Sequence, residues 1–183
     1  MADTQRSVSD ILTLLADNTN QAISPQDMRD SFVTWRMGHG QLYVAAADAA
    51  AITIADTTNY VEATAPAWTA SAGLHWFDES DGNGRLTYTG VADVVVHVAA
   101  TVSFTVSGTN DVIHWRIGKN GTTDVASEVE VKVGTGSDVQ STAMHLVTTM
   151  STGDHLSLFT RNATAVENVT LEVANLQAMT MPA

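Results

Sequence analysis

From about residue 42 onward, hydrophobic residues alternate with polar ones, which is the period of a β-strand with one buried face. The clearest case is the segment 91–107, where the alternate positions are apolar: Val94, Val96, Val98, Ala100, Val102, Phe104 and Val106. Further strands are expected at 51–54, 59–64, 73–77, 85–89, 112–117, 125–133, 139–150, 155–162 and 166–178. Many strands separated by turn residues predict an all-β jelly-roll β-sandwich.

Two local patterns refine this prediction. Asn120 and Gly121 follow a strand-like segment, and an Asn-Gly pair readily adopts the positive φ angles of a type I′ turn, so a hairpin is expected there. In the closing segment 171–176, the alternation of apolar with other residues predicts that Leu171, Val173 and Asn175 share one face of a strand.

The first forty residues have a helical pattern instead. Short helices are expected at 9–16 and 25–35, and the second begins with the elements of a capping box: Ser24, Pro25 and Asp27. Helices this short are not stable alone in water, so they must dock on their own domain, a sister subunit or a larger partner. The expected organisation is a helical N-terminal arm for docking and assembly at 1–40 and a jelly-roll domain at 41–183.

Composition excludes several classes of function. Lys and Arg total 8 against 20 Asp and Glu, giving a net charge of −12, so neither nucleic acid nor an anionic membrane is an expected partner. The absence of cysteine excludes disulfide frameworks, zinc knuckles, iron–sulfur ligation and cysteine nucleophiles. Hydrophobic residues make up 44% of the chain, enough for a real core. The first residues lack the basic and apolar regions of a secretory signal, so synthesis in a reducing cytosol is expected.

The residues offer little catalytic chemistry. Six histidines lie in different expected segments, and none forms an H-E-x-x-H or H-x-H motif (His39, His75, His97, His114, His145 and His155). They are expected as interface or surface residues, with a metal site assembled from separate strands as the alternative. Neither a G-x-S-x-G elbow nor a phosphate loop occurs. The chain is therefore expected not to be an enzyme and to need no cofactor.

The loop 78–84 is the best candidate for a small binding site. Asp78, Asp81 and Asn83 offer oxygen atoms to calcium, a cation that takes six to eight such ligands. The loop lacks the glutamate at the twelfth position that the helix–loop–helix template requires. It is therefore expected to be a solvated turn with no metal, and calcium stays the weaker alternative.

Two surfaces are candidates for recognition and assembly. Trp76, Trp115 and Arg116 are residue types that dominate interface hot spots, although core packing is the favoured interpretation for each tryptophan and surface recognition the alternative. The strand-like segment 139–150 carries uncharged Ser and Thr at many positions. A sheet surface of this composition favours packing against other subunits, and symmetric homo-oligomerisation covers such faces and edges.

Part of the chain resembles a known superfamily. The segments Val91–Phe104, Trp115–Gly121, Thr152–Phe159 and Val169–Met179 resemble the strand and hairpin core of tumour-necrosis-factor-like jelly rolls, including a K-N-G turn and a G-D-x-L-x-L pattern. The chain departs from that pattern at Gly90, which is followed by Val91 instead of an aromatic residue. The resemblance implies a compact homotrimer.

A second resemblance concerns the arm. The segments Asp10–Thr19 and Ala22–Asp30 resemble an N-terminal element of tailed-bacteriophage virion proteins, where it precedes variable β domains of fibre and decoration proteins. This implies a non-enzymatic virion structural protein, made in the host cytoplasm. The leading expectation is a homotrimeric capsid decoration (cement) protein that stabilises the head; the alternative is a tail-fibre tip or receptor-binding protein that recognises the host surface.

Each alternative has its own expected contact residues. A decoration protein would dock on the major capsid protein or other virion proteins through apolar residues of the arm: Ile11, Leu12, Leu15, Ile23, Met28 and Phe32. A receptor-binding protein would use the aromatic loops around Trp76, Trp115 and Arg116.

Overall fold

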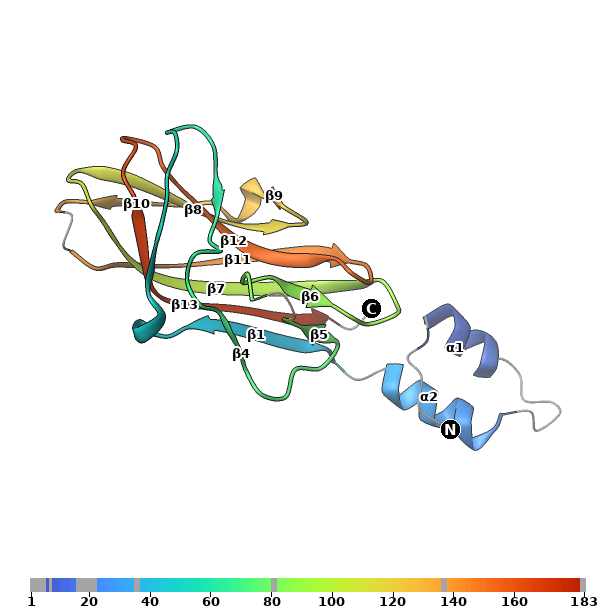
Figure 1. Cartoon of the computed structure of the whole chain (residues 1–183). Coiled ribbons are helices and arrows are strands. Elements are labelled where there is room, and N and C mark those ends of the chain that lie inside the picture. The colour runs from blue at the N-terminus through green and yellow to red at the C-terminus, as the bar shows by residue number, and fades with distance from the viewer. Residues whose placement is uncertain are drawn as a thin grey trace.

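The computed structural model describes residues 6, 8–15, 23–34, 37–79, 82–135 and 138–181. Figure 1 shows two antiparallel sheets packed face to face, with two short helices ahead of them in the chain. Strands that are far apart in the sequence lie side by side in both sheets, as in a jelly roll. The predicted all-β jelly-roll sandwich is confirmed.

The first sheet, sheet A, has the strand order β11-β7-β13-β1-β4, and β2 also pairs with β13. Its longest strands, β7 and β13, are neighbours in the middle of the sheet. The bounds of its strands are β1 His39–Val44, β2 Ala50–Ile52, β4 Thr69–Ala70, β7 Val94–Val106, β11 Gln140–Met150 and β13 Val169–Met181.

The second sheet, sheet B, has the order β10-β8-β12-β6-β5, with β3 paired to β12 and β9 paired to β8. Two 3₁₀ turns complete the described structure, η1 (Ala46–Asp48) and η2 (Val125–Ser127). The bounds of the strands are β3 Val61–Glu62, β5 Phe77–Asp78, β6 Leu86–Tyr88, β8 Asp111–Lys119, β9 Thr122–Thr123, β10 Val129–Val133 and β12 His155–Asn162.

The core lies between the two sheets. The alternate apolar row of β7 from Val96 to Val106 is buried, as its pattern predicts, and faces the buried side chains of β8 and β12. Trp115 on β8 has no exposed surface, and its ring packs against that of Phe104 at a centroid distance of 5.5 Å. The hypothesis that Trp115 is a surface recognition residue is therefore wrong, because its ring fills the space between the sheets.

The closing strand contains a bulge that changes which residues face outward. The pairing of β13 with β7 shifts between Leu171, which lies opposite Phe104, and Val173, which lies opposite Ser103. Leu171 is therefore buried while Val173 is 44% exposed. The prediction that the two share a face is wrong, because the inserted residue reverses the alternation.

The predicted hairpin is confirmed. Asn120 and Gly121 have φ angles of 52° and 77°, the left-handed conformations that a type I′ turn requires at both central positions. The turn joins β8 to the short strand β9. The side chain of Asn120 donates to Asp154 (2.6 Å) and accepts from the backbone N–H of His155 (2.9 Å), which ties the turn to β12.

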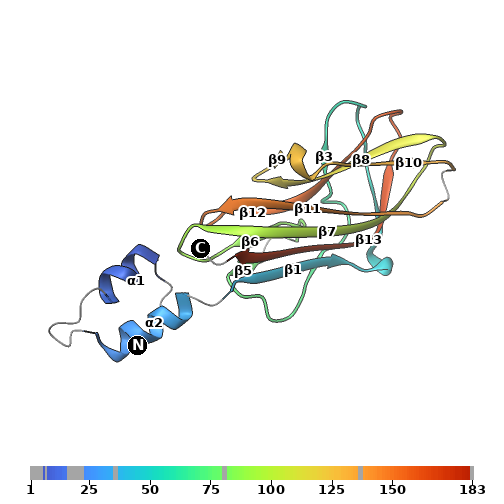
Figure 2. The same ribbon diagram turned by 180° about the vertical axis from the view of Figure 1, so that it is seen from behind.

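The two expected helices are α1 (Val8–Leu15) and α2 (Pro25–Thr34). The capping box of α2 is present, because Ser24 N–H donates to Asp27 (2.8 Å) and Asp27 N–H donates to Ser24 Oγ (3.1 Å). Figures 1 and 2 show both helices beyond the end of the sandwich where β1 begins. Among the described residues, no helix is long and apolar enough to cross a membrane.

Strand β1 was not predicted from the sequence. Gly40 resembles a helix terminator after the expected helix, but it lies inside the strand, directly beneath Phe77. A Cβ atom at this position would lie 2.5 Å from Phe77 Cβ and 2.9 Å from Leu86 Cδ1. Glycine therefore allows β1 to approach sheet B closely. β1 begins at His39, and the division of the chain at residue 41 stays a prediction.

We expect Gly40→Ala to lower the free energy of unfolding by about 1–3 kcal/mol, because the added methyl group overpacks the core against Phe77. Gly134→Ala is the matched control, since no atom lies within 4 Å of a Cβ built there, and it should change stability by less than about 0.5 kcal/mol. Chemical denaturation of both variants measures the difference. Equal stabilities would contradict this account of β1.

Candidate functional site

The outward side of sheet A is an unusual surface for so acidic a protein. Four neighbouring strands present alternate side chains to the exterior, and we call this set the uncharged face. None of its members is Asp, Glu, Lys or Arg: Gln41, Tyr43, Val95, His97, Ala99, Thr101, Ser103, Ser141, Ala143, His145, Val147, Thr149, Val173, Asn175, Gln177 and Met179. Charged residues are 15% of the chain, so their exclusion from this surface distinguishes it from the rest of the exterior.

The register of the strands arranges these residues in rows across the sheet. Thr101 on β7 lies between Asn175 on β13 and Ala143 on β11, and Tyr43 of β1 continues this row. Exposed hydrophobic side chains lie around this row, since Val147 is 54%, Val173 44%, Met179 41% and Tyr43 37% exposed. An apolar and uncharged surface of this kind is typical of a protein–protein contact.

Two histidines belong to the uncharged face. His97 lies between Met179 and Val147, and His145 lies opposite Ala99 in the next row. Their ring centroids are 6.1 Å apart, and the ring planes are tilted by 36°. The sequence prediction of surface or interface histidines agrees with these positions, although no motif singled them out.

The outward side of sheet B is charged and closely hydrogen-bonded. Glu128, between η2 and β10, accepts from Tyr60 Oη (2.6 Å), His114 Nδ1 (2.7 Å) and Arg116 Nη2 (2.7 Å). The guanidinium groups of Arg116 and Arg161 lie over the ring of Tyr60 at 4.4 and 5.0 Å from its centroid. This cluster joins two strands of sheet B to the segment before β3 and to the η2 turn.

The hydrogen bonds of the cluster hold Glu128 ionised. Its pKa falls to about 2, chiefly because of the Tyr60 hydroxyl and then the Arg116 guanidinium. The pKa of Tyr60 rises to about 12, first through burial and then through its bond to Glu128. Arg116, a predicted recognition residue, therefore already has a carboxylate partner. Sequence reasoning missed Glu128 and Tyr60, because they are distant from each other along the chain and belong to no motif.

The remaining recognition residue, Trp76, lies between His75, which forms a bridge with His39, and β5 at the edge of sheet B. It is half-buried, has a positive φ of 59°, and its ring stacks on that of His75 at a centroid distance of 4.6 Å. Gly38 lies against the ring, since a Cβ there would be 2.8 Å from Trp76 Cε3. Trp76 thus packs against the start of β1 on one side.

Part of the acidic loop 78–84 lies outside the described residues. Asp78 Oδ1 accepts from the backbone N–H of Glu79 (2.8 Å), and Asp81 lies outside the described residues. Asn83 is exposed and has a polar contact of its own. Within the described ranges, no group of three or more His, Cys, Asp or Glu side chains is placed to hold a metal ion.

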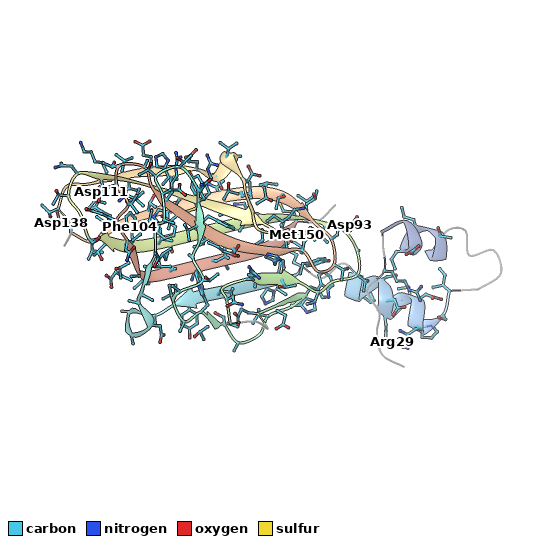
Figure 3. The ribbon with its side chains drawn as sticks, turned by 45° about the horizontal axis from the view of Figure 1, so that its top comes forward. Arg29, Asp93, Phe104, Asp111, Asp138 and Met150 are labelled. Atoms are coloured by element: carbon cyan, nitrogen blue, oxygen red, sulfur yellow. The ribbon has the colours of Figure 1, made fainter. Side chains whose placement is uncertain are left out.

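A pair of carboxyl groups that the sequence did not single out lies at the end of the sandwich away from the helices, where Figure 3 labels Asp111. Asp111 is buried, and its Oδ2 has no hydrogen-bond partner among the described residues. Glu167 approaches it in the space left by the missing side chain of Gly108. Burial and then Asp111 raise the pKa of Glu167, so the carboxyl group of Glu167 holds its proton more tightly than an ordinary glutamate does.

The docking residues of the arm fall into two groups. Leu12, Met28 and Phe32 are 63%, 43% and 69% exposed, as an outward docking role requires. Ile11 is only 2% exposed, so the prediction that it docks outward is wrong; its side chain is buried within the protein itself. Ile23 is half-buried, and the side chain of Leu15 lies outside the described part.

The architecture is similar to solved structures. Eiger TNF from S. frugiperda matches with a TM-score of 0.50 and 11% identity, over 80% of this chain and 93% of that chain. Murine APRIL at pH 5.0 matches with a TM-score of 0.52 and 9% identity, over 78% of this chain and 99% of that chain. The chain has a TNF-like jelly-roll fold. No protein-family model and no curated protein matches the sequence, so the likeness establishes the fold alone.

The charged cluster of this jelly roll predicts a pH-dependent stability. The pKa of Glu128 is about 2 in the fold against an ordinary value of 4.5, so its contribution is complete above pH 4.5 and is lost as the pH falls toward 2. We expect Glu128→Gln to lower the free energy of unfolding by about 2 kcal/mol at pH 7, with the difference vanishing near pH 2.

Glu130→Gln is the control for this prediction. Its side chain is 63% exposed and lies 3.7 Å from His114 Nε2, so its loss should cost less than about 0.5 kcal/mol at any pH. Chemical denaturation at several pH values compares both variants with the wild type. A deficit in Glu128→Gln that stays constant between pH 7 and pH 2 would contradict the assignment.

Proposed function

We propose that the chain is a non-enzymatic structural protein that works as a homotrimer, with the uncharged face as its subunit contact. The observation that carries the proposal is the exclusion of charged side chains from this face in a chain of net charge −12. A sheet surface that faces water usually carries charged residues, whereas the buried core of a protein–protein contact is depleted of charged residues. The exposed side chains of Val147, Val173 and Met179 gain burial when a second copy covers them.

Three copies are proposed because of the fold. The resemblance of the sequence to tumour-necrosis-factor-like jelly rolls implies a compact trimer, and the fold of this chain is similar to those of Eiger TNF and murine APRIL. A ring also lets each copy cover the face of the next without leaving an open end, so growth stops at a closed particle. The charged cluster around Glu128 lies on the opposite sheet, where it stays in contact with solvent.

We expect Thr101→Arg to convert the trimer into monomers, because it places an unpaired guanidinium in the middle of the uncharged face. Thr122→Arg on β9 of sheet B is the matched control, since the same exposed residue type is replaced away from that face. Analytical ultracentrifugation at pH 8 should give about 58 kDa for the wild type and the control, three times the chain mass of 19.4 kDa.

The variant Thr101→Arg should sediment near 19.4 kDa. A wild-type chain that is monomeric at pH 8 would overturn the proposed function. If the variant Thr101→Arg stays trimeric, the uncharged face is not the subunit contact.

The finer proposal is that this trimer is a capsid decoration (cement) protein on the head of a tailed phage. Its support is the resemblance of the arm and the exposed apolar side chains of Leu12, Met28 and Phe32, which lie beyond the end of the sandwich. The arm would dock these side chains on the major capsid protein or other virion proteins. A trimer that binds only the assembled lattice stabilises the head by mass action.

A host-recognition role at the tip of a tail fibre is the second candidate, and Trp76 supports it as a partly exposed aromatic ring. Of the three residues that the sequence offers for receptor recognition, Trp115 is buried in the core and Arg116 is bound to Glu128, so Trp76 alone supports this role. We therefore favour the decoration role.

We expect Phe32→Asp to leave the trimer intact but to weaken binding to phage heads about 10- to 100-fold, the value of one buried phenyl ring. Arg29→Asp, an exposed position one turn earlier on α2, is the control and should bind as the wild type does. Co-sedimentation with heads that lack the protein measures both. Binding that is equal in the two variants, or label on the tail in immunogold micrographs of virions, would contradict the decoration role.

A further inference from the structure

The ionisable groups of the uncharged face are imidazoles, apart from one phenol. They are the imidazoles of His97 and His145 and the phenol of Tyr43, with no carboxylate among the members of the face, and a third imidazole, that of His39, lies at its edge opposite Met179. The direct cross-strand neighbours of His97 are Met179 and Val147, and a direct neighbour of His145 is Ala99. No residue in these rows offers a negative charge to a protonated ring.

The charged and titratable groups around this surface are at its borders. On β13 the nearest acid is Glu172, which accepts from Thr105 Oγ1 (3.0 Å) and lies seven strand positions from Met179, about 23 Å along the strand. On the side of the helices, Asp93 lies in the loop before β7.

Four further titratable groups lie at the same border, two at the end of β11 and two at the start of β1. Lys119 of β8 donates to the backbone carbonyl of Thr149 (2.9 Å) and lies 3.4 Å from Asp154, so the end of β11 has a cation already paired with an acid. At the end of β1, His39 lies 6.2 Å from His75 between ring centroids, and its Nε2 contacts Gly73 O at 2.9 Å. These groups add no acid beside His97 or His145.

We propose that His97 and His145 make the trimer dissociate reversibly in mildly acidic solution. This inference rests on the proposed trimer. A histidine ordinarily protonates near pH 6.5, and an imidazolium buried in an uncharged contact without an acid partner is strongly disfavoured. The two rings of one chain are 6.1 Å apart, so protonation of both places two like charges side by side, and this repulsion is stronger in a water-excluded contact than in the solvent-exposed separated chain.

The direction of the effect follows from proton linkage. The separated chains bind protons at these two rings, whereas the trimer excludes them, so acid favours the separated chains. At pH 5.5 each imidazole raises the dissociation constant by about tenfold relative to pH 8. Two rings in each of three copies give an upper limit of about a million-fold. A trimer stable at micromolar concentration at pH 8 would then be monomeric at pH 5.5.

The test is the mass of the full chain in solution at pH 8 and at pH 5.5, by analytical ultracentrifugation at one concentration. We expect a trimer at pH 8, a monomer at pH 5.5 and the trimer again after return to pH 8. The tryptophan fluorescence of each sample, to which the buried Trp68 and Trp115 contribute, reports whether the fold is intact. The double variant His97→Gln/His145→Gln should stay trimeric at both pH values, while His155→Gln on sheet B should dissociate as the wild type does.

The outcomes separate the inference from the proposed function. A monomer at pH 8 overturns the trimer itself. A trimer at both pH values overturns the histidine switch and leaves the trimer standing. Dissociation or unfolding of the double variant at pH 5.5 to the same extent as the wild type also overturns the switch, because other groups would then be responsible.

Discussion

The pairing of β7 with β13 is the constraint on which the rest of the structure depends. Both strands have 13 residues and lie in the middle of sheet A. Their inward residues form much of the core, and their outward residues form the centre of the uncharged face. A slip of one residue would exchange the two sets, so the core and the proposed contact surface are specified together. The bulge at Leu171–Val173 shifts this register by one residue, and so changes which residues of β13 face the core and which face outward.

The outward surfaces of the two sheets differ in the chemistry of their side chains. Sheet B covers its surface with ionised groups that satisfy one another, and the low pKa of Glu128 shows how strongly that carboxylate is held. Sheet A has no such network within the uncharged face, and its one acid on β13, Glu172, lies at the bulge and accepts from Thr105. The asymmetry gives the molecule one side suited to its own copies and one suited to water, which is what a closed oligomer needs.

The sequence predicts most of the fold and less of the site. Period-two alternation locates the long strands, and Ser24 and Asn120 mark a helix start and a hairpin correctly. The sequence does not predict β1, because a glycine such as Gly40 usually marks the end of an element. Its role in the close approach of the two sheets is visible only in the tertiary structure. Core packing and surface recognition both stayed open for Trp115, because a buried and an exposed aromatic residue look alike in one sequence, and the structure shows core packing. The uncharged face was foreseen only as a Ser/Thr-rich segment, since its rows join strands far apart in the chain.

The most direct test of the central claim is the solvent accessibility of the uncharged face in the native protein. The chain has no cysteine, so Ala143→Cys introduces a single thiol on that face and Thr122→Cys introduces one on sheet B. The rate of alkylation of each thiol at pH 8 is the measurement. The account predicts that Cys at 122 reacts at the rate of a free thiol, whereas Cys at 143 reacts at least about tenfold more slowly. Equal rates would show that the face is open to solvent and would contradict the account.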